Sequence, residues 1–184
     1  MSSQVPLVHL TVEDYLEGER SSPVRHEYIA GQVYAMAGAS QAHNTIALNL
    51  ATRLRGHTRG GPCRVFMSDL KVRVEATNSF YYPDVVVSCD PTDREEYFVA
   101  RPCLIVEISS PSTEAIDRRE KLVAYQRIDS LREYVLIAQD EVRAHVYRRD
   151  NMGDWWIETL APDDELRLEL VGLNIPLAEL YEDI

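Results

Sequence analysis

Two carboxylates lie inside stretches that are otherwise apolar enough to form buried strands. Glu107 interrupts the run CLIVEI at 103–108, and Asp84 stands between Pro83 and the run VVV at 85–87. An unpaired carboxylate buried in a strand costs several kcal/mol or is forced neutral. If the two strands are neighbours, both acids converge as the hard oxygen ligands that Mg²⁺ or Mn²⁺ prefers. Such a metal would polarise a phosphodiester and lower the pKa of a bound water.

Lys121 is the candidate cation for the same chemistry. A phosphodiesterase site usually adds a cation that steadies the attacking water or the charge of the transition state. Lys121 lies in the next predicted helix, with Asp117 one turn before it and Tyr125 one turn after it on the same face. Of the 19 cationic residues, only Lys71 and Lys121 are lysine. A compact ammonium differs chemically from a guanidinium, which favours a specific role for Lys121.

Each of these residues also has a structural interpretation. Glu107 could face solvent from an edge strand, and Asp84 could be a turn residue that opens its strand after a proline. Lys121 could form a solvated surface pair with Asp117. His43, in the helix predicted over 40–57, could contact the site or a phosphate, or could have a structural role. The residues alone leave these alternatives open.

The elements that would position these residues follow from periodicity and capping. Thr11 and Ser40 are expected N-caps of helices over 11–20 and 40–57, and Ala30-Gly31 is the expected turn of a hairpin over 25–36. Another helix is predicted from Thr113 to about Arg127, and a short one at 176–183. The predicted strands are 63–69, 71–75, 81–89, 103–109, 133–138, 142–149, 155–160 and 166–170. These elements predict an α/β (α+β) domain with a mixed central sheet.

The strand over 103–109 should be covered on both faces. Because side chains alternate along a strand, Leu104, Val106 and Ile108 face one way, and Ile105, Glu107 and Ser109 face the other. Both sets begin with apolar residues, as in a central strand. Glu107 should then emerge where this strand reaches a cleft.

Length and composition indicate one globular domain over residues 1–184. No apolar run approaches the roughly 18 residues that cross a bilayer, and the first residues do not resemble a secretory signal, so no membrane association is expected. Three cysteines, Cys63, Cys89 and Cys103, are odd in number and lack the spacing of a metal site. We therefore expect reduced cysteines in a cytoplasmic protein.

The net charge of -11 is unevenly distributed along the chain. Residues 150–184 hold ten acids and one cation, Arg167, and form an acidic C-terminal segment. The stretch from Arg53 to Arg73 holds six cations and one acid, Asp69. Phosphate binding depends on cations, and this basic stretch could supply them. Overall acidity therefore does not exclude a nucleic-acid partner.

The order of several short motifs resembles a known group of enzymes. Pro83-Asp84 followed by Val106-Glu107-Ile108-Ser109 resembles the core of the PD-(D/E)XK nuclease superfamily, with the usual lysine moved to the following helix. The chain is more closely similar to the Uma-type (Uma-two) restriction-endonuclease-like family, from about Thr11 to Ile184. The segments that carry this resemblance are HEYIAGQVYAMAG, SDLKV, YYPDVVV, LIVEISSPST, DRREKLVAY and REYVLIA.

This resemblance implies a restriction-endonuclease-like fold and metal-dependent cleavage of DNA. Asp84 and Glu107 match the metal ligands, Lys121 matches the displaced catalytic lysine, and Glu27 matches an N-terminal acidic position that completes the catalytic and metal site. From its surroundings alone, Glu27 could equally face solvent. The expected function is therefore a Mg²⁺-dependent (or Mn²⁺-dependent) DNA endonuclease that uses a metal-activated water.

Three further expectations accompany this reading. Superfamily nucleases commonly dimerise to cut both strands, so a homodimer is expected. The main alternative is a non-catalytic module of the same fold that binds nucleic acid or a protein partner. A second alternative is a metal-dependent hydrolase of another phosphodiester, such as RNA or a small nucleotide.

Overall fold

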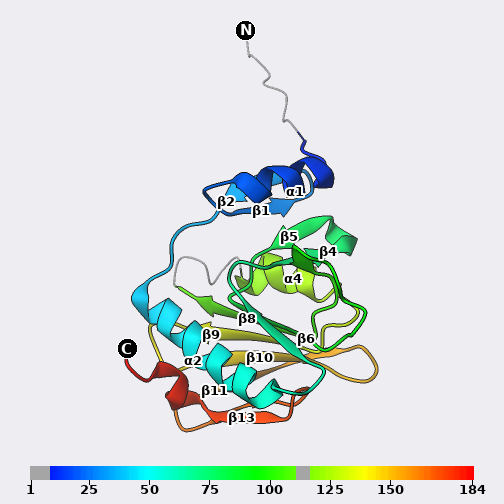
Figure 1. Cartoon of the computed structure of the whole chain (residues 1–184). Coiled ribbons are helices and arrows are strands. Elements are labelled where there is room, and N and C mark those ends of the chain that lie inside the picture. Colours follow the sequence, from blue (N-terminus) through cyan, green and yellow to red (C-terminus); the bar gives the residue numbers. More distant parts are fainter. Residues whose placement is uncertain (1–8, 111–116) are drawn as a thin grey trace.

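A computed structural model describes residues 9–110 and 117–184 (Figure 1). Two helices precede the strand that carries Glu107, and a π-helical turn continues as a short α-helix after it. The remaining helical segments are single 3₁₀ turns. In chain order, the helices are α1 (Val12–Ser21), α2 (Gln41–Thr58), η1 (Glu75–Thr77), η2 (Asp117–Lys121), α4 (Leu122–Tyr125) and η3 (Leu177–Tyr181).

The strands form two larger sheets and one hairpin. The five-stranded sheet has the order β2-β1-β5-β4-β7, the six-stranded sheet has the order β11-β10-β9-β8-β6-β3, and β12 pairs with β13. Both larger sheets are mixed, because β8–β9 and β4–β7 are parallel while the other pairs are antiparallel. The strands are β1 (His26–Ile29), β2 (Gln32–Ala35), β3 (Arg64–Met67), β4 (Lys71–Val74), β5 (Ser79–Tyr81), β6 (Val85–Ser88), β7 (Phe98–Val99), β8 (Leu104–Ser109), β9 (Glu133–Ala138), β10 (Ala144–Arg149), β11 (Trp155–Leu160), β12 (Glu165–Leu168) and β13 (Leu173–Pro176).

Strand β8 lies at the centre of the six-stranded sheet, which is covered on both faces. Leu104, Val106 and Ile108 belong to the core cluster beneath α2, together with apolar residues of β12, β13 and η3. Ile105 belongs to a second cluster that includes α4 and residues of β4 and β5. The alternation predicted for this strand is therefore confirmed. Figure 1 shows α4 between the six-stranded sheet and the smaller sheet that carries α1.

The N-terminal helices and the hairpin form where the sequence predicts them. Thr11 caps α1 by accepting a hydrogen bond from the Asp14 amide, and Ser40 caps α2 by accepting one from His43. Ala30 and Gly31 form the hairpin turn with positive φ angles of 48° and 97°. The mixed α+β architecture agrees with the predicted fold class. The predicted helix start at 113–116 lies outside the described residues.

The strand predicted over 81–89 is wrong in one important respect. The chain leaves the five-stranded sheet after Tyr81 and enters the six-stranded sheet at Val85. Proline has no amide hydrogen to donate to a ladder, so Pro83 marks the crossing. Asp84 consequently lies at the junction of the two sheets. Strands β7 and β13 have no counterpart in the sequence prediction, and the last predicted helix is the 3₁₀ turn η3.

The expectation of three reduced cysteines is wrong for two of them. Cys63 and Cys89 form a disulfide, and Cys103 is free and buried. The register Arg64↔Ser88 between β3 and β6 places the two bonded cysteines opposite each other, although they are 26 residues apart in sequence. No helix among residues 9–110 and 117–184 is both long and apolar enough to cross a membrane.

A buried polar network joins α1 to the five-stranded sheet. Glu19 on α1 is only 5% exposed and accepts hydrogen bonds from the His26 amide at 2.8 Å and the Tyr82 hydroxyl at 2.9 Å. Lys71 on β4 donates to the same Tyr82 hydroxyl at 3.3 Å. Burial lowers the pKa of the Lys71 ammonium, while the charge of Glu19 opposes that shift. This network fixes the helix over the sheet that carries Glu27.

The lowered pKa of Lys71 predicts a pH-dependent contribution to stability. Because its pKa is lower in the folded chain than in the unfolded one, the unfolded chain binds more protons between the two values. The free energy of unfolding should therefore rise as pH increases from the folded pKa towards the unfolded value of about 10.4. Urea unfolding of wild type and Lys71→Met at several pH values tests this. The free energy of unfolding of the variant should rise less over this pH range than that of wild type. Parallel pH profiles for the two proteins would contradict the prediction.

Candidate active site

Asp84 directly precedes β6, beside the end of β8 that carries Glu107. In the antiparallel pairing of β6 with β8, the register ends at Val85 with Val106, so Asp84 and Glu107 are the residues that follow this last pair on each side. The Ile108 amide donates a hydrogen bond to Asp84 Oδ2 at 2.7 Å, which links the aspartate to the strand of the glutamate. The two acids therefore meet, as predicted, at one end of these two neighbouring strands.

Glu107 is buried, and two donors from the following helical segment contact it. The residue is 4% exposed, which rejects the alternative of a solvent-facing glutamate on an edge strand. Lys121 Nζ lies 3.2 Å from Glu107 Oε1, and the Tyr125 hydroxyl donates to the same oxygen at 3.0 Å. Burial, followed by the negative charge of Glu107, raises the pKa of Tyr125 well above its ordinary value. Tyr125 therefore stays protonated and remains a donor to the carboxylate.

Glu27 reaches the same ammonium from the other sheet. Lys121 Nζ lies 3.1 Å from Glu27 Oε1, and the Tyr82 amide approaches this oxygen at 3.5 Å. Glu27 belongs to β1, so the ammonium bridges a carboxylate of the five-stranded sheet and a carboxylate of the six-stranded sheet. The interpretation of Lys121 as a solvated surface residue is wrong, because the residue is 8% exposed. The Asp117 side chain, the predicted partner of Lys121 in a surface pair, lies outside the part of the chain that the structure describes.

His43 holds the second oxygen of Asp84. The first turn of α2 places His43 Nε2 at 2.7 Å from Asp84 Oδ1. Because an ionised carboxylate only accepts hydrogen bonds, Nε2 carries the hydrogen in this pair. Both Asp84 oxygens thus receive a donor, one from the helix and one from the β8 backbone. This contact favours the interpretation of His43 as part of the site.

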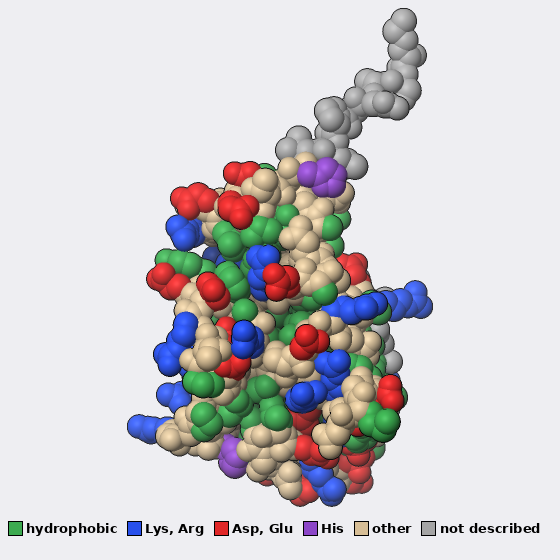
Figure 2. Space-filling view, turned by 90° about the vertical axis from the view of Figure 1, so that its right-hand side faces the viewer, with side chains coloured by type: hydrophobic (Ala, Val, Ile, Leu, Met, Phe, Trp, Pro, Cys, Tyr) green, Lys and Arg blue, Asp and Glu red, His purple; other side chains and the backbone are tan. Residues whose placement is uncertain are grey.

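A cleft of about 1480 Å³ is lined by Glu27, His43, Asp84, Glu107 and Lys121. Its walls come from both larger sheets, from the start of α2 and from the helical segment of Lys121. The charged side chains among its described lining residues are five acids and three cations, namely Glu27, Asp69, Asp84, Glu107, Glu120, Arg25, Arg119 and Lys121. The cleft therefore has an excess of negative charge. Figure 2 shows that acidic and basic side chains are interspersed on one outer face of the molecule.

The carboxylate oxygens of this site are suitable ligands for a hard divalent cation. Carboxylate oxygens are the ligands that Mg²⁺ and Mn²⁺ prefer. Asp84 and Glu107 supply two such groups in one cleft, whereas Lys121 lies against both Glu27 and Glu107. No group of three or more His, Cys, Asp or Glu in the described part of the chain is arranged to hold a metal ion as it stands. Asp84 and Glu107 are the best candidates for ligands, and metal ligation by Glu27 stays a prediction.

The structure brings together all four residues predicted for the site. Asp84, Glu107, Lys121 and Glu27 meet in one cleft, although they are distributed from β1 to the helix after β8. Two contributors were not assigned a role from the sequence. Tyr125 could have been found from its helical spacing to Lys121, whereas nothing in the sequence indicates that the Ile108 amide binds Asp84. Asp69 also lines the cleft, but its side chain is 80% exposed and pairs with Arg25.

Comparison with a solved structure places the fold in a class. The crystal structure of a "putative nuclease belonging to DUF820" from Anabaena variabilis matches with a TM-score of 0.74 over 94% of this chain and 97% of that chain. The two sequences are 18% identical, so this likeness describes the fold alone. This chain thus has the same fold as that putative nuclease.

The family is shown by the sequence comparisons. Residues 12–178 match the family model Uma2, described as "Putative restriction endonuclease". Uncharacterized protein slr1290 of Synechocystis sp. is 38% identical over 184 residues, which are 100% of this chain and 97% of that protein. Uncharacterized protein sll1609 of the same organism is 32% identical over 154 residues, 82% of this chain and 87% of that protein. The chain belongs to the Uma2 family, which confirms the resemblance drawn from the motifs.

Proposed function

We propose that this protein is a Mg²⁺-dependent DNA endonuclease that hydrolyses phosphodiester bonds, with Mn²⁺ as a possible substitute. One observation carries the proposal: Asp84 and Glu107 line one cleft at the ends of neighbouring strands, with a lysine held against the glutamate. The description of the family supports DNA as the substrate. The negative charge of the cleft supports a divalent cation, which would offset it before a phosphate enters.

Each side chain would have a distinct task in this reaction. Asp84 and Glu107 would hold the metal, which when bound supplies a Lewis acid for the phosphodiester and lowers the pKa of a bound water. Lys121 would orient the attacking water or stabilise the negative charge that develops on the phosphate. Glu27 and Tyr125 would hold the Lys121–Glu107 pair in place, and His43 would fix the orientation of Asp84.

Metal titration combined with plasmid nicking tests this proposal. Isothermal titration of Mg²⁺ and Mn²⁺ should show binding to wild type and loss of binding in Asp84→Asn and in Glu107→Gln, because an amide is a weak ligand for a hard cation. Nicking should require the metal and should disappear in both variants. Asp69→Asn is the matched control, since Asp69 lines the same cleft but is exposed and pairs with Arg25; this variant should bind metal and nick as wild type does.

The possible outcomes separate the proposal from its alternatives. Nicking that survives in Asp84→Asn or Glu107→Gln would remove these residues from the reaction. Metal binding without cleavage of duplex DNA, single strands or RNA would favour the non-catalytic module. Cleavage of RNA or a small nucleotide in preference to DNA would keep the site and change the substrate. A homodimer, the expected state for cutting both strands, is checked by sedimentation with and without DNA.

His43→Ala should weaken metal binding without abolishing it. Asp84 Oδ1 would lose the donor that fixes its orientation, and removal of such supporting contacts typically lowers metal affinity or activity about 10–100-fold. His57→Ala provides a control on the same helix, since His57 Nε2 contacts the Val171 carbonyl oxygen at 2.8 Å instead of the site. We expect the control to titrate as wild type. Equal metal affinity in His43→Ala and wild type would show that His43 has no positioning role.

A further inference from the structure

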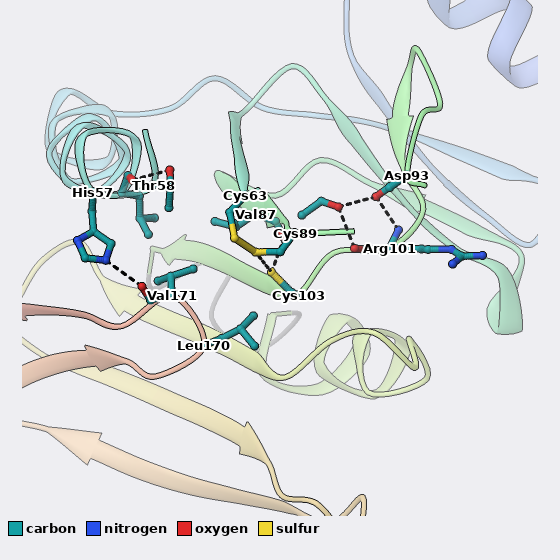
Figure 3. Close-up of a disulfide and its surroundings, with 12 residues drawn as sticks. His57, Thr58, Cys63, Val87, Cys89, Asp93, Arg101, Cys103, Leu170 and Val171 are labelled. Carbon is teal, nitrogen blue, oxygen red and sulfur yellow. Dashed lines mark hydrogen bonds between the residues drawn. A yellow bond between two sulfur atoms is a disulfide. The ribbon is translucent and has the colours of Figure 1, made fainter. Parts of the chain in front are cut away.

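Three cysteines converge at the opposite end of the strands that carry Asp84 and Glu107. Cys63 directly precedes β3, Cys89 directly follows β6 and Cys103 directly precedes β8. The Cys63–Cys89 disulfide therefore ties the edge strand β3 to β6. On the other side of β6, the Cys103 amide donates to the Val87 carbonyl at 2.8 Å. Figure 3 shows the Cys103 sulfur pointing at the disulfide.

The Cys103 thiol is close enough to the disulfide to react with it. Its Sγ lies 3.4 Å from Cys89 Sγ, which is within the separation of about 3–3.5 Å that characterises reacting atoms held for attack. The thiol also lies 3.2 Å from the Val87 carbonyl oxygen, a hydrogen-bond acceptor for its proton. Cys89 is therefore the sulfur that a Cys103 thiolate would attack.

The segment between Cys89 and Cys103 is fixed by one buried aspartate. Asp93 is 5% exposed and accepts hydrogen bonds from the Ala100 amide at 3.1 Å and the Arg101 amide at 3.0 Å. The Ser88 hydroxyl, next to Cys89, lies 2.9 Å from the same carboxylate. These contacts hold the two ends of the segment together. Figure 3 shows Asp93 beside Arg101. The proximity of the two sulfurs is thus built into the fold around them.

We infer that Cys63, Cys89 and Cys103 form a thiol–disulfide exchange site, in which the disulfide of Cys89 moves between Cys63 and Cys103. In the forward step, Cys103 loses its proton to solvent and its sulfur attacks Cys89 Sγ. The Cys89–Cys103 bond forms as the Cys63–Cys89 bond breaks, and Cys63 leaves with the electron pair as a thiolate that takes up a proton. No oxidant or reductant is consumed, because one disulfide and one thiol are present before and after the step.

The protonation of Cys103 sets the rate of this exchange. Burial raises the pKa of the Cys103 thiol to about 12. Only the thiolate attacks, so exchange should be slow near neutral pH and should speed up about tenfold per pH unit below that pKa.

The exchange would change which strand is tethered to β6. With the bond on Cys63, the edge strand β3 is held; with the bond on Cys103, β3 is released at that end. The other end of β3 leads to Ser68, whose amide donates to the Asp84 carbonyl at 3.1 Å and which lines the cleft. The position of the disulfide therefore decides whether β3 is covalently tethered to β6. Strand β3 runs from the cysteines to the candidate active site.

Disulfide mapping of the full chain tests this inference. Cleavage after arginine places the three cysteines on separate peptides, since Arg59, Arg64, Arg73 and Arg94 separate them. Reduced Cys63→Ser, oxidised with diamide, should give an intramolecular Cys89–Cys103 disulfide. Oxidised wild type, treated with iodoacetamide, should slowly yield alkylated Cys63, about tenfold faster for each unit of higher pH. Cys103→Ser, the control, should keep Cys63 unmodified.

Two results would overturn the inference. One is a folded Cys63→Ser, with the thermal unfolding profile of wild type, that yields only dimers or free thiols after oxidation. The other is oxidised wild type in which Cys103 alone is alkylated at every pH up to 10. Equal alkylation of Cys63 in wild type and Cys103→Ser would likewise show that Cys63 is freed by another route.

Discussion

Lys121→Met should reduce cleavage about 100- to 1,000-fold, the usual loss when one preorganised electrostatic group is removed from an active site. The ammonium lies 3.1 Å from Glu27 and 3.2 Å from Glu107, so both acids hold it in a fixed position inside the cleft. Methionine fills a similar volume but carries no charge. Mg²⁺ affinity should stay the same or rise, because the substitution removes a cation that competes for Glu107. Single-turnover nicking and metal titration measure the two effects separately.

Arg119→Met is the matched control for this experiment. Arg119 belongs to the same helical turn and lines the same cleft, but it is exposed. Its removal tests whether any nearby positive charge suffices, and we expect less than a tenfold loss if Lys121 acts at the reacting phosphate. Equal losses in the two variants would indicate a general electrostatic contribution. Wild-type cleavage by Lys121→Met would exclude the lysine from the reaction.

Lys121→Met should also destabilise the fold by about 3–5 kcal/mol, the typical cost of leaving one partner of a buried ion pair uncompensated. The Glu107 side chain is 5% exposed and the Lys121 side chain 9% exposed, so solvent cannot replace the lost partner. Adding Glu107→Gln removes one of the two carboxylate charges that this substitution leaves without the lysine, and Glu27 keeps the other. The double variant should therefore lose less stability than the two single variants lose together. Urea unfolding of all four proteins at neutral pH gives this coupling free energy.

The control for the cycle is a pair that shares no contact. Lys121→Met combined with His57→Ala should show additive losses within about 0.5 kcal/mol. Additive losses for Lys121→Met and Glu107→Gln as well would mean that the pair contributes no coupling to the folded state. The same unfolding curves show whether every variant is folded in the absence of urea. Cleavage should be compared under conditions in which all of them are folded.

The sequence was sufficient to predict the strand that carries Glu107. Uninterrupted apolar residues at 103–106 required a strand covered on both faces, and the alternation fixed the face of the glutamate. The capping residues Thr11 and Ser40 likewise located two helices. The four residues of the candidate site were named from carboxylates in apolar surroundings and from the order of motifs. Their roles remain predictions that the experiments above address.

The parts that could not be predicted depend on long-range pairing. Pro83 was expected at a strand start, but only tertiary structure shows that the chain changes sheets there. Cys63 and Cys89 became a disulfide because β3 pairs with β6, and a count of cysteines cannot supply that register. Nothing in the sequence of the first helix indicates that Glu19 is buried, yet it accepts a hydrogen bond from the Tyr82 hydroxyl. In each case the decisive neighbour is many residues away in the chain.

The ion pair between Glu27 and Lys121 has a consequence for recombining members of this family. Of the four residues of the candidate site, residues 9–35 supply only Glu27. The other three come from beyond residue 40. A chimaera that joined the first segment of one relative to the remainder of another would take the carboxylate and the ammonium of this ion pair from different proteins. Such a graft would have to preserve both a carboxylate at position 27 and an ammonium at position 121. A crossover in the connection at 36–40, between β2 and α2, would separate the two members of this pair.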